Sequence, residues 1–498
     1  MNFLWLIRNE SYKKGMLLSV IFNIIAKGIL FLLTILVARF FGSNIRTDIY
    51  FFVYGTMILL SGFTGAIDTA VLIPRSMKLR EEAGDTAAQG FLNYFFRIYI
   101  LLGILFAILV FFFGVKLFNF FSKFGEEDIL LYKNYFLAGS LYFFFMILTN
   151  YLNAILGSLR FFTVPMIISG INSCIVIASI FLLHRQYDVL SVFIGGIAAY
   201  SINLVILLVV MKKMLSWDFF ITATPQRTAG NIFYAGLGQL ATVASSFLPL
   251  FLLSGFGQGV ISMMNYGKNI ADIPNSLFTA QLTSVSGIQL NEQAARQQLP
   301  AMNDTFQHIT RLLLYILIPA GLYLFVFATP VVQVFYQSRH FDAAAIAGSA
   351  QFLRLLAVTV FSIGINAAVS RLFIALQAIR QAFVYQLIVN SCLIAAIWIL
   401  TGYYGVDGYP YAVISINLLN FGLMYFVCKR LLLTIDYIAV VRYVGIIMLI
   451  NLVIGTGLYY ADLYLDAGIL MKLIAGFLIW FLILLLLNNK FKFTAAAG

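Results

Sequence analysis

Charged residues are scarce in this chain. Asp, Glu, Lys and Arg make up 10% of its 498 residues, whereas hydrophobic residues make up 62%. Because soluble domains contain roughly 25% charged residues, this composition excludes a soluble globular protein and predicts an integral membrane protein. The net charge of +12 is expected to reflect cytoplasmic loops rich in Lys and Arg, not binding to nucleic acid.

Cysteine, histidine and the common catalytic motifs are also sparse. The three cysteines are Cys174, Cys392 and Cys428. They contain no CxxC pair, so the sequence predicts neither a disulfide framework nor a metal site. The three histidines form no metal-ligand spacing and no catalytic motif, and a Walker A loop is lacking. We therefore expect no enzyme activity, metal or cofactor. Energy would come from an H⁺ or Na⁺ gradient, the membrane potential or the substrate's own gradient.

Long apolar runs dominate the chain. A membrane helix needs about 20 mostly apolar residues, and residues 2–8 are too few, so they are interpreted as a short interfacial segment. The sequence predicts fourteen spans, at 16–41, 48–74, 91–119, 130–156, 161–183, 189–211, 230–255, 259–288, 309–335, 343–376, 380–401, 406–428, 439–460 and 467–488. The fold class is therefore an all-α integral membrane protein.

The loops between these runs predict an orientation. With the N-terminus inside, the cytoplasmic loops contain most of the Lys and Arg residues, including Lys78, Lys212 and Lys213. The outer loops contain few, such as Arg46 and Arg185. Because cytoplasmic loops are enriched in Lys and Arg, both termini are predicted to be cytoplasmic, in a bacterial inner membrane.

The chain divides near its middle. We predict an N-terminal lobe at 1–211, a cytoplasmic linker at 212–229, a C-terminal lobe at 230–430, and two additional spans with a tail at 431–498. The dipeptide "YG" at 54–55 recurs at 266–267, each time after an aromatic-Gly stretch. This repeat indicates two related halves, an arrangement that transporters use with a site at the interface.

A few ionisable residues fall inside the predicted spans, where each costs a few kcal/mol or more. They are Lys27, Asp68, Lys268, Asp272 and Arg354. Lys27 and Arg354 have no partner at helical spacing, so we expect them to face water or an anionic ligand in a cavity between the halves. Asp68 and Asp272 are the candidates for binding a proton or a cation.

The stretch "YGKNIADIP" at 266–274 places Lys268 and Asp272 one helical turn apart, just before Pro274. One interpretation is that both line a wet path. The other is that they neutralise each other as an i,i+4 pair. Proline removes a backbone donor, so Pro274 leaves the carbonyl of Ile270 without its usual partner and is the candidate hinge.

Three stretches, taken together, resemble one family. They are "LVARFFGSNIRTDIYFFVYG" at 36–55, "YGKNIADIPNSLFTAQLTSV" at 266–285, and residues 331–383, which begin "VVQVFYQSRHFD" and include "RLFIALQAIRQAF". In order and placement they are similar to three regions of the MurJ type, the lipid II flippases: the first-span exit with the second-span entry, the eighth span, and the ninth loop with the tenth span. That family belongs to the multidrug/oligosaccharidyl-lipid/polysaccharide (MOP) flippase superfamily.

The resemblance implies two pseudo-symmetric six-helix lobes around a central cavity that opens to alternate sides of the membrane. It also implies two C-terminal spans that provide a groove for a lipid tail. In the family, arginines in spans 1, 2 and 8 face the diphosphate of the substrate, since guanidinium pairs bidentately with phosphate oxygens.

This sequence departs from that pattern. The family's first-span arginine position is Lys27, a following Arg-Asp pair falls at Leu33 and Thr34, and the second-span arginines are replaced by "LLSG" at 59–62. The eighth-span arginine falls at Asn269, beside Lys268. Lysine binds phosphate as a point charge without the fork of arginine. The resemblance with these departures therefore implies either lipid II held by a different set of contacts or a related polyprenyl-diphosphate-linked glycan.

The resemblance therefore predicts a flippase for a polyprenyl-diphosphate-linked saccharide, with roles in peptidoglycan synthesis or polysaccharide export. Lys27, Lys268 and Arg354 would attract the diphosphate, and three polar side chains would meet the headgroup: Asn23, Asn269 and Asn366. Two alternatives remain open: a cation-coupled drug exporter of the same superfamily, and a non-transporting membrane scaffold for glycan-synthesis enzymes. The expected partners are the lipid-linked substrate, membrane lipids and such enzymes, with no nucleic acid.

Overall fold

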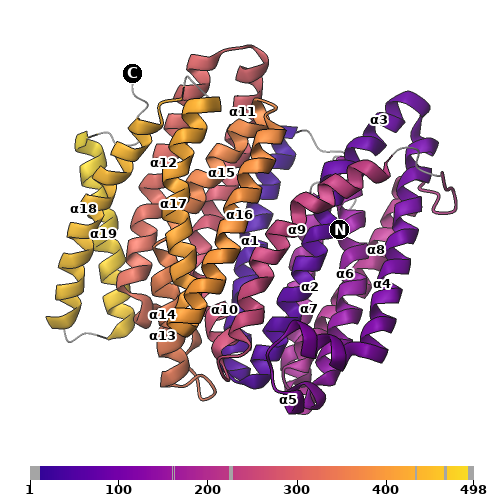
Figure 1. Cartoon of the computed structure of the whole chain (residues 1–498), viewed down its shortest axis with the longest axis horizontal. Coiled ribbons are helices and arrows are strands. Elements are labelled where there is room, and N and C mark those ends of the chain that lie inside the picture. Colours follow the sequence, from indigo (N-terminus) through magenta and orange to yellow (C-terminus); the bar gives the residue numbers. More distant parts are fainter. Residues whose placement is uncertain are drawn as a thin grey trace, which may run out of the picture. The chain divides into compact units, whose positions relative to one another are not determined.

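The computed structural model is helical (Figure 1) and describes residues 12–159, 161, 163–223, 228–431, 435–464 and 468–491. The predicted interfacial segment at 2–8 and the end of the C-terminal tail lie outside these residues, as do positions 224–227 of the predicted linker. Apart from helices, the described residues contain one isolated β-bridge, between Ser338 and Phe341. The all-α fold class is thus confirmed.

By its contacts the chain forms two compact units, Met1–Ser262 and Met263–Gly498. The helices of the first unit are α1 (Tyr12–Phe41), α2 (Ile45–Ile67), the π-helical turn η2 (Asp68–Leu72), α3 (Ile73–Ala83), α4 (Asp85–Phe121), α5 (Glu126–Leu131), α6 (Lys133–Ser158), α7 (Thr163–Tyr187), α8 (Leu190–Met214) and α9 (Ala229–Leu253). Helix α9 packs against α2 in this unit. The predicted lobe boundary at 212–229 stays a prediction.

Helix α10 (Val260–Ala271) begins in the first unit and continues into the second. The other helices of the second unit are the π-helical turn η3 (Asn275–Thr279), α11 (Ala280–Ala295), α12 (Leu299–Val326), α13 (Ala328–Tyr336), α14 (Ala343–Ala357), α15 (Val360–Ala375), α16 (Ile379–Tyr404), the 3₁₀ turn η4 (Gly405–Asp407), α17 (Gly408–Leu431), α18 (Tyr437–Tyr464) and α19 (Ile469–Phe491).

Capping residues explain why α2 and α10 begin where they do. The side chain of Asn44 accepts from the backbone N–H of Thr47, and the Thr47 hydroxyl oxygen accepts from the backbone N–H of Asn44 at 2.9 Å, which forms a capping box. The buried carboxylate of Asp48 accepts from the backbone N–H groups of Gly259 at 2.5 Å and Ser262 at 2.7 Å. These bonds satisfy donors that the first turn of α10 would otherwise leave unpaired.

The two C-terminal helices pack on the second unit through long-range polar contacts. The indole Nε1 of Trp480 in α19 donates to Asn451 Oδ1 in α18 at 2.7 Å. The hydroxyls of Tyr323 and Tyr315 in α12 donate to backbone carbonyls of α19, those of Leu473 at 2.9 Å and Leu484 at 2.5 Å. Helices α18 and α19 lie at one edge of the second unit (Figure 1). Their predicted role as a groove for a lipid tail stays a prediction.

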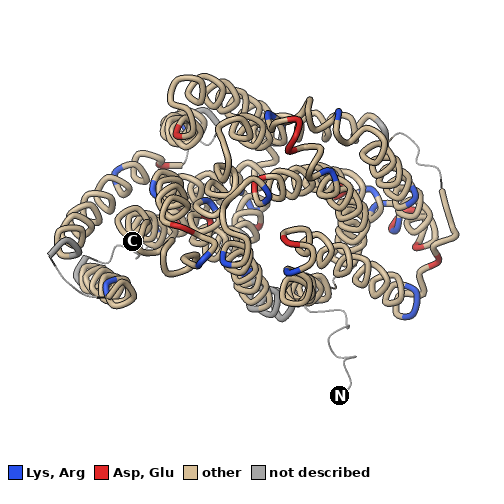
Figure 2. Tube along the Cα trace, turned by 90° about the horizontal axis from the view of Figure 1, so that it is seen from below, with Lys and Arg blue, Asp and Glu red and all other residues tan. Residues whose placement is uncertain are grey.

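The predicted count of fourteen spans is not confirmed. Among the described residues, 11 helical segments are long and apolar enough to cross a membrane, or 12 if the bent pair α14 and α15 is one span. One segment, Arg380–Lys429, contains both α16 and α17. The segment predicted at 259–288 is not one continuous α-helix but comprises α10, the π-helical turn η3 and part of α11. Charged positions are few and scattered along the trace (Figure 2).

Candidate functional site

Lys268 and Asp272 form an ion pair at the end of α10. Their Nζ and Oδ2 atoms are 2.6 Å apart, and their side chains are 45% and 44% exposed. The i,i+4 spacing places both on one face of the helix. The structure thus confirms that they contact each other, and their exposure shows that the pair is not sealed in protein packing. Asn269, the other predicted contact in this turn, is partly buried.

Close helix packing holds the charged turn against a neighbouring helix of the second unit. A Cβ atom on Gly267 would lie 2.5 Å from the carbonyl oxygen of Ser349 and 2.8 Å from the backbone nitrogen of Leu353, both in α14. Only glycine allows such an approach. Tyr409, a buried residue of α17, lies near both Lys268 and Asp272. Sequence reasoning missed Tyr409, since nothing in its local pattern relates it to α10.

Pro274 directly precedes the π-helical turn η3. It is buried, and the backbone N–H of Ser276 still donates to the carbonyl of Asp272 at 2.9 Å. Single π-helical turns within helices are frequent at functional sites. The first unit has a comparable turn, η2, which is followed by Pro74 in α3. The hinge role of Pro274 stays a prediction. The regular α-helical pattern changes directly after it, at η3.

Arg354 lies in the last turn of α14 and is partly buried. Its Nη2 is 3.5 Å from the Thr329 hydroxyl in α13. It forms no ion pair within the described part of the chain. Most of its hydrogen-bonding capacity is therefore available to an anion.

Asn366 belongs to a polar cluster within α15, α16 and α17. Its Oδ1 accepts from Asn420 Nδ2 at 2.7 Å and from the Tyr385 hydroxyl at 3.4 Å, and that hydroxyl also bonds to Asn420 Oδ1. The amide oxygen of Asn366 is thus used within the protein. Sequence reasoning missed Asn420, although a polar residue inside an apolar run is the signal that marked Asn366.

In the first unit, Lys27 lies on α1 with its side chain exposed. No ion pair or hydrogen bond joins it to any residue that the structure describes. The expectation that Lys27 faces water or an anionic ligand stays a prediction. Asn23 lies one turn earlier on the same helix, but its side chain lies outside the described part.

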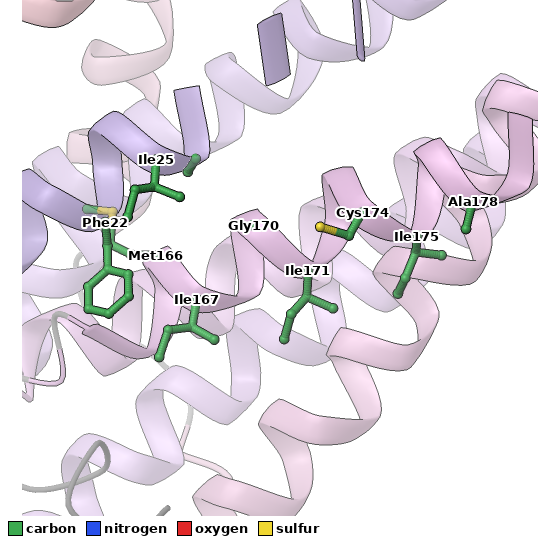
Figure 3. A pocket seen from close by; sticks show the side chains of 10 residues that line it. Phe22, Ile25, Met166, Ile167, Gly170, Ile171, Cys174, Ile175 and Ala178 are labelled. Atoms are coloured by element: carbon green, nitrogen blue, oxygen red, sulfur yellow. The ribbon is translucent and has the colours of Figure 1, made fainter. Parts of the chain in front are cut away.

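A groove of about 440 Å³ runs beside α1 (Figure 3). It is lined by Phe22, Ile25 and Ala26 of α1 and by residues of α7 such as Ile171. Lys27 is not among its lining residues, and the lining is apolar. The groove therefore suits hydrocarbon and not a diphosphate, because an anion without a polar partner is costly to desolvate.

Asp68 is buried, with 2% of its surface exposed, in the π-helical turn η2. Its Oδ1 accepts from the Tyr99 hydroxyl of α4 at 2.6 Å. Burial separates Asp68 from bulk ions, whereas Asp272 is half-exposed. The sequence predicted Asp68 as a candidate but not its partner Tyr99.

Comparison with known proteins gives one coherent result. The family model of the lipid II flippase MurJ matches residues 37–479. A probable lipid II flippase MurJ of Bdellovibrio bacteriovorus is 20% identical over 220 residues, which cover 44% of this chain and 41% of that relative. The aligned region thus spans less than half of that relative's length.

The solved structures agree on the fold. A lipid II flippase MurJ in an inward closed conformation superposes with a TM-score of 0.80 at 20% identity, over 95% of this chain and 98% of the other. A multidrug resistance transporter of the MATE family, solved in an inward-facing conformation, gives a TM-score of 0.65 at 14% identity over 90% and 100%. The MATE transporters are thus more remote structural neighbours.

Proposed function

This chain belongs to the lipid II flippase MurJ family, and we propose that it moves lipid II, a polyprenyl-diphosphate-linked saccharide, from the inner to the outer leaflet. The main support is the family match over residues 37–479, which includes most of the segments able to cross a membrane. The lipid tail would stay in the bilayer while the headgroup crosses, so the protein must provide polar contacts at depth.

The proposed headgroup contacts are cations with unused donors. Lys27 is exposed and Arg354 has a single weak hydrogen bond, each within its own unit. Lys268 is held by Asp272, so its positive charge is available only in part. Each cation is proposed to meet the diphosphate as the headgroup passes. Asn23, Asn269 and Asn366 are proposed to hydrogen-bond the sugars or peptide of the headgroup.

Transport is proposed to be coupled to H⁺, Na⁺ or the membrane potential. Asp272 is better placed than Asp68 to exchange an ion, because Asp272 is half-exposed and Asp68 is buried against Tyr99. Binding of a proton or cation to Asp272 would free Lys268 for the diphosphate. No chemical change in the substrate is expected.

The protein is proposed to lie in the bacterial cytoplasmic membrane with both termini cytoplasmic. The support is the alternation of Lys- and Arg-rich loops with loops that contain few cations. Enzymes that make or polymerise the glycan are proposed partners.

Native mass spectrometry of the purified full chain tests the substrate. We expect a co-purified lipid with the mass of a polyprenyl-diphosphate glycan. Recovery of bulk phospholipid alone, from cells in which lipid II is abundant, would contradict the proposal. A drug that co-purifies, or reduced drug susceptibility of cells that express the chain, would support the exporter alternative.

The proposed site is tested separately, with reconstituted vesicles and fluorescent lipid II. Lys27→Ala combined with Lys268→Ala is expected to reduce translocation to the level of protein-free vesicles. The matched control is Lys116→Ala, which removes an exposed cation near the C-terminal end of α4 and should leave the translocation rate unchanged. Full activity in the double variant would refute these two residues but not the function.

A further inference from the structure

The segment that follows α8, residues 215–223, is hydrogen-bonded to α4. The Nδ2 atom of Asn93 in α4 donates to the carbonyls of Asp218 at 2.7 Å and Ile221 at 2.8 Å. The indole Nε1 of Trp217 donates to Asn93 Oδ1 at 2.9 Å. Both Asn93 and Trp217 are buried. Residues 215–223 therefore pack against α4.

One turn further along α4, Arg97 holds the next residues of the same segment. Its Nη2 donates to the carbonyl of Phe220 at 3.0 Å and is 3.3 Å from that of Phe219. The side chain of Phe220 is nevertheless 87% exposed. Moving an exposed phenyl ring from water into an apolar environment would stabilise the protein by about 1.5–3 kcal/mol.

The position of Arg97 on α4 indicates what surrounds that ring. The large exposed apolar side chains of α4 begin at Leu101 and end at Phe121. Twenty steps of about 1.5 Å give about 30 Å, the thickness of the hydrocarbon core. Arg97 lies one turn before Leu101 on the face shared by Ile104 and Ile108. Arg97 and Phe220 therefore lie at the headgroup layer, on the side of the membrane where α4 begins.

Two further cations belong to the same end of the first unit. Lys212 and Lys213 lie in the last turn of α8, and both are exposed. Neither they nor Arg97 form an ion pair within the described part of the chain. The acidic residue of this segment, Asp218, uses Oδ1 to accept from the backbone N–H of Phe220 at 2.9 Å. The surface is therefore positive on balance.

We propose that Arg97, Lys212, Lys213 and Phe220 form an interfacial site for an anionic phospholipid. Because the backbone carbonyls engage only Nη2 of Arg97 among the described contacts, Nη1 and Nε remain for the lipid phosphate. Lysine side chains reach the headgroups by extending along the surface, and the ring of Phe220 inserts at the acyl boundary. The site ties residues 215–223, which follow α8, to the membrane surface.

Quenching of a reporter tryptophan by brominated lipid tests this site in the full-length protein. Phe220→Trp is reconstituted in phosphatidylcholine vesicles that also contain phosphatidylglycerol, with bromine on the acyl chains of one lipid or the other. The signal of the protein without the substitution is subtracted. We expect stronger quenching by brominated phosphatidylglycerol than by the same amount of brominated phosphatidylcholine. Equal quenching by the two lipids, or none, would overturn the proposal.

Charge variants in the Phe220→Trp background identify the cations. Each Lys or Arg near an anionic surface is expected to change the preference for the anionic lipid about fivefold. The variant that combines Lys212→Gln with Lys213→Gln should thus reduce this preference by about 25-fold. It leaves the hydrogen bonds of Arg97 to the backbone unchanged. Arg97→Gln should reduce the preference about fivefold. The control Lys116→Gln, which lies near the C-terminal end of α4 and so in the opposite half of the bilayer, should leave this preference unchanged. An equal loss in the control would overturn the proposal.

Discussion

The ion pair between Lys268 and Asp272 gives the sharpest prediction, because its strength depends on what surrounds it. The two side chains are 45% and 44% exposed and their charged atoms are 2.6 Å apart. If the exposed faces meet water, the pair should be worth about 0.2–1 kcal/mol, as for solvent-exposed ion pairs. If they meet hydrocarbon or dry protein, removal of one partner should cost about 3–5 kcal/mol. The proposed function requires the lower value, because it needs Lys268 and Asp272 to face water.

A double-mutant cycle separates these cases. Lys268→Met, Asp272→Asn and the double variant are purified, and their free energies of unfolding are measured in denaturant. We expect a coupling energy below about 1 kcal/mol. The matched control is the ion pair of Arg46 and Asp188, whose side chains are 54% and 36% exposed; its coupling energy should be similar. A coupling energy above about 3 kcal/mol for Lys268 and Asp272 would place the pair in a dry environment and refute the wet path.

Three further predictions test single contacts, two through stability and one through fluorescence. Tyr99→Phe should reduce the free energy of unfolding by about 1–3 kcal/mol, because it removes the hydroxyl bonded to buried Asp68; a fully stable variant in denaturant would contradict the contact. Gly267→Ala should cost about 1–3 kcal/mol by forcing α10 from α14, whereas Gly62→Ala, with nothing within 4 Å of the added carbon, should not; similar melting temperatures would count against the packing. Asn93→Leu should shift the fluorescence of Trp217 to longer wavelength by freeing its indole; an unchanged spectrum would mean that the hydrogen bond between Trp217 and Asn93 is not needed to hold the indole in place.

The sequence predicted the features that depend on local spacing. Apolar runs of about 20 residues located most of the helices, and the i,i+4 spacing of Lys268 and Asp272 identified their contact. The C-terminal runs at 439–460 and 467–488 correspond to α18 and α19. In each case the relevant neighbours lie within one helix, so periodicity alone is informative.

The sequence could not predict contacts between residues far apart in the chain. Tyr99 and Asp68 are 31 positions apart, and Asn420 and Asn366 are 54 apart. Trp217 and Asn93 are separated by 124 positions. Such pairs depend on which helix faces pack together, and hydropathy does not encode that. The π-helical turns η2 and η3 were also missed, although Pro74 and Pro274 mark the places where the regular hydrogen-bond pattern changes.

The central claim is that this chain translocates a lipid with a charged headgroup. Its most direct test is the rate at which fluorescent lipid II becomes accessible to a membrane-impermeant reductant in vesicles that contain the purified full-length protein. Access to the inner-leaflet pool at a rate well above that of protein-free vesicles is the predicted result. A rate equal to that of protein-free vesicles, with the protein folded and inserted, would contradict it.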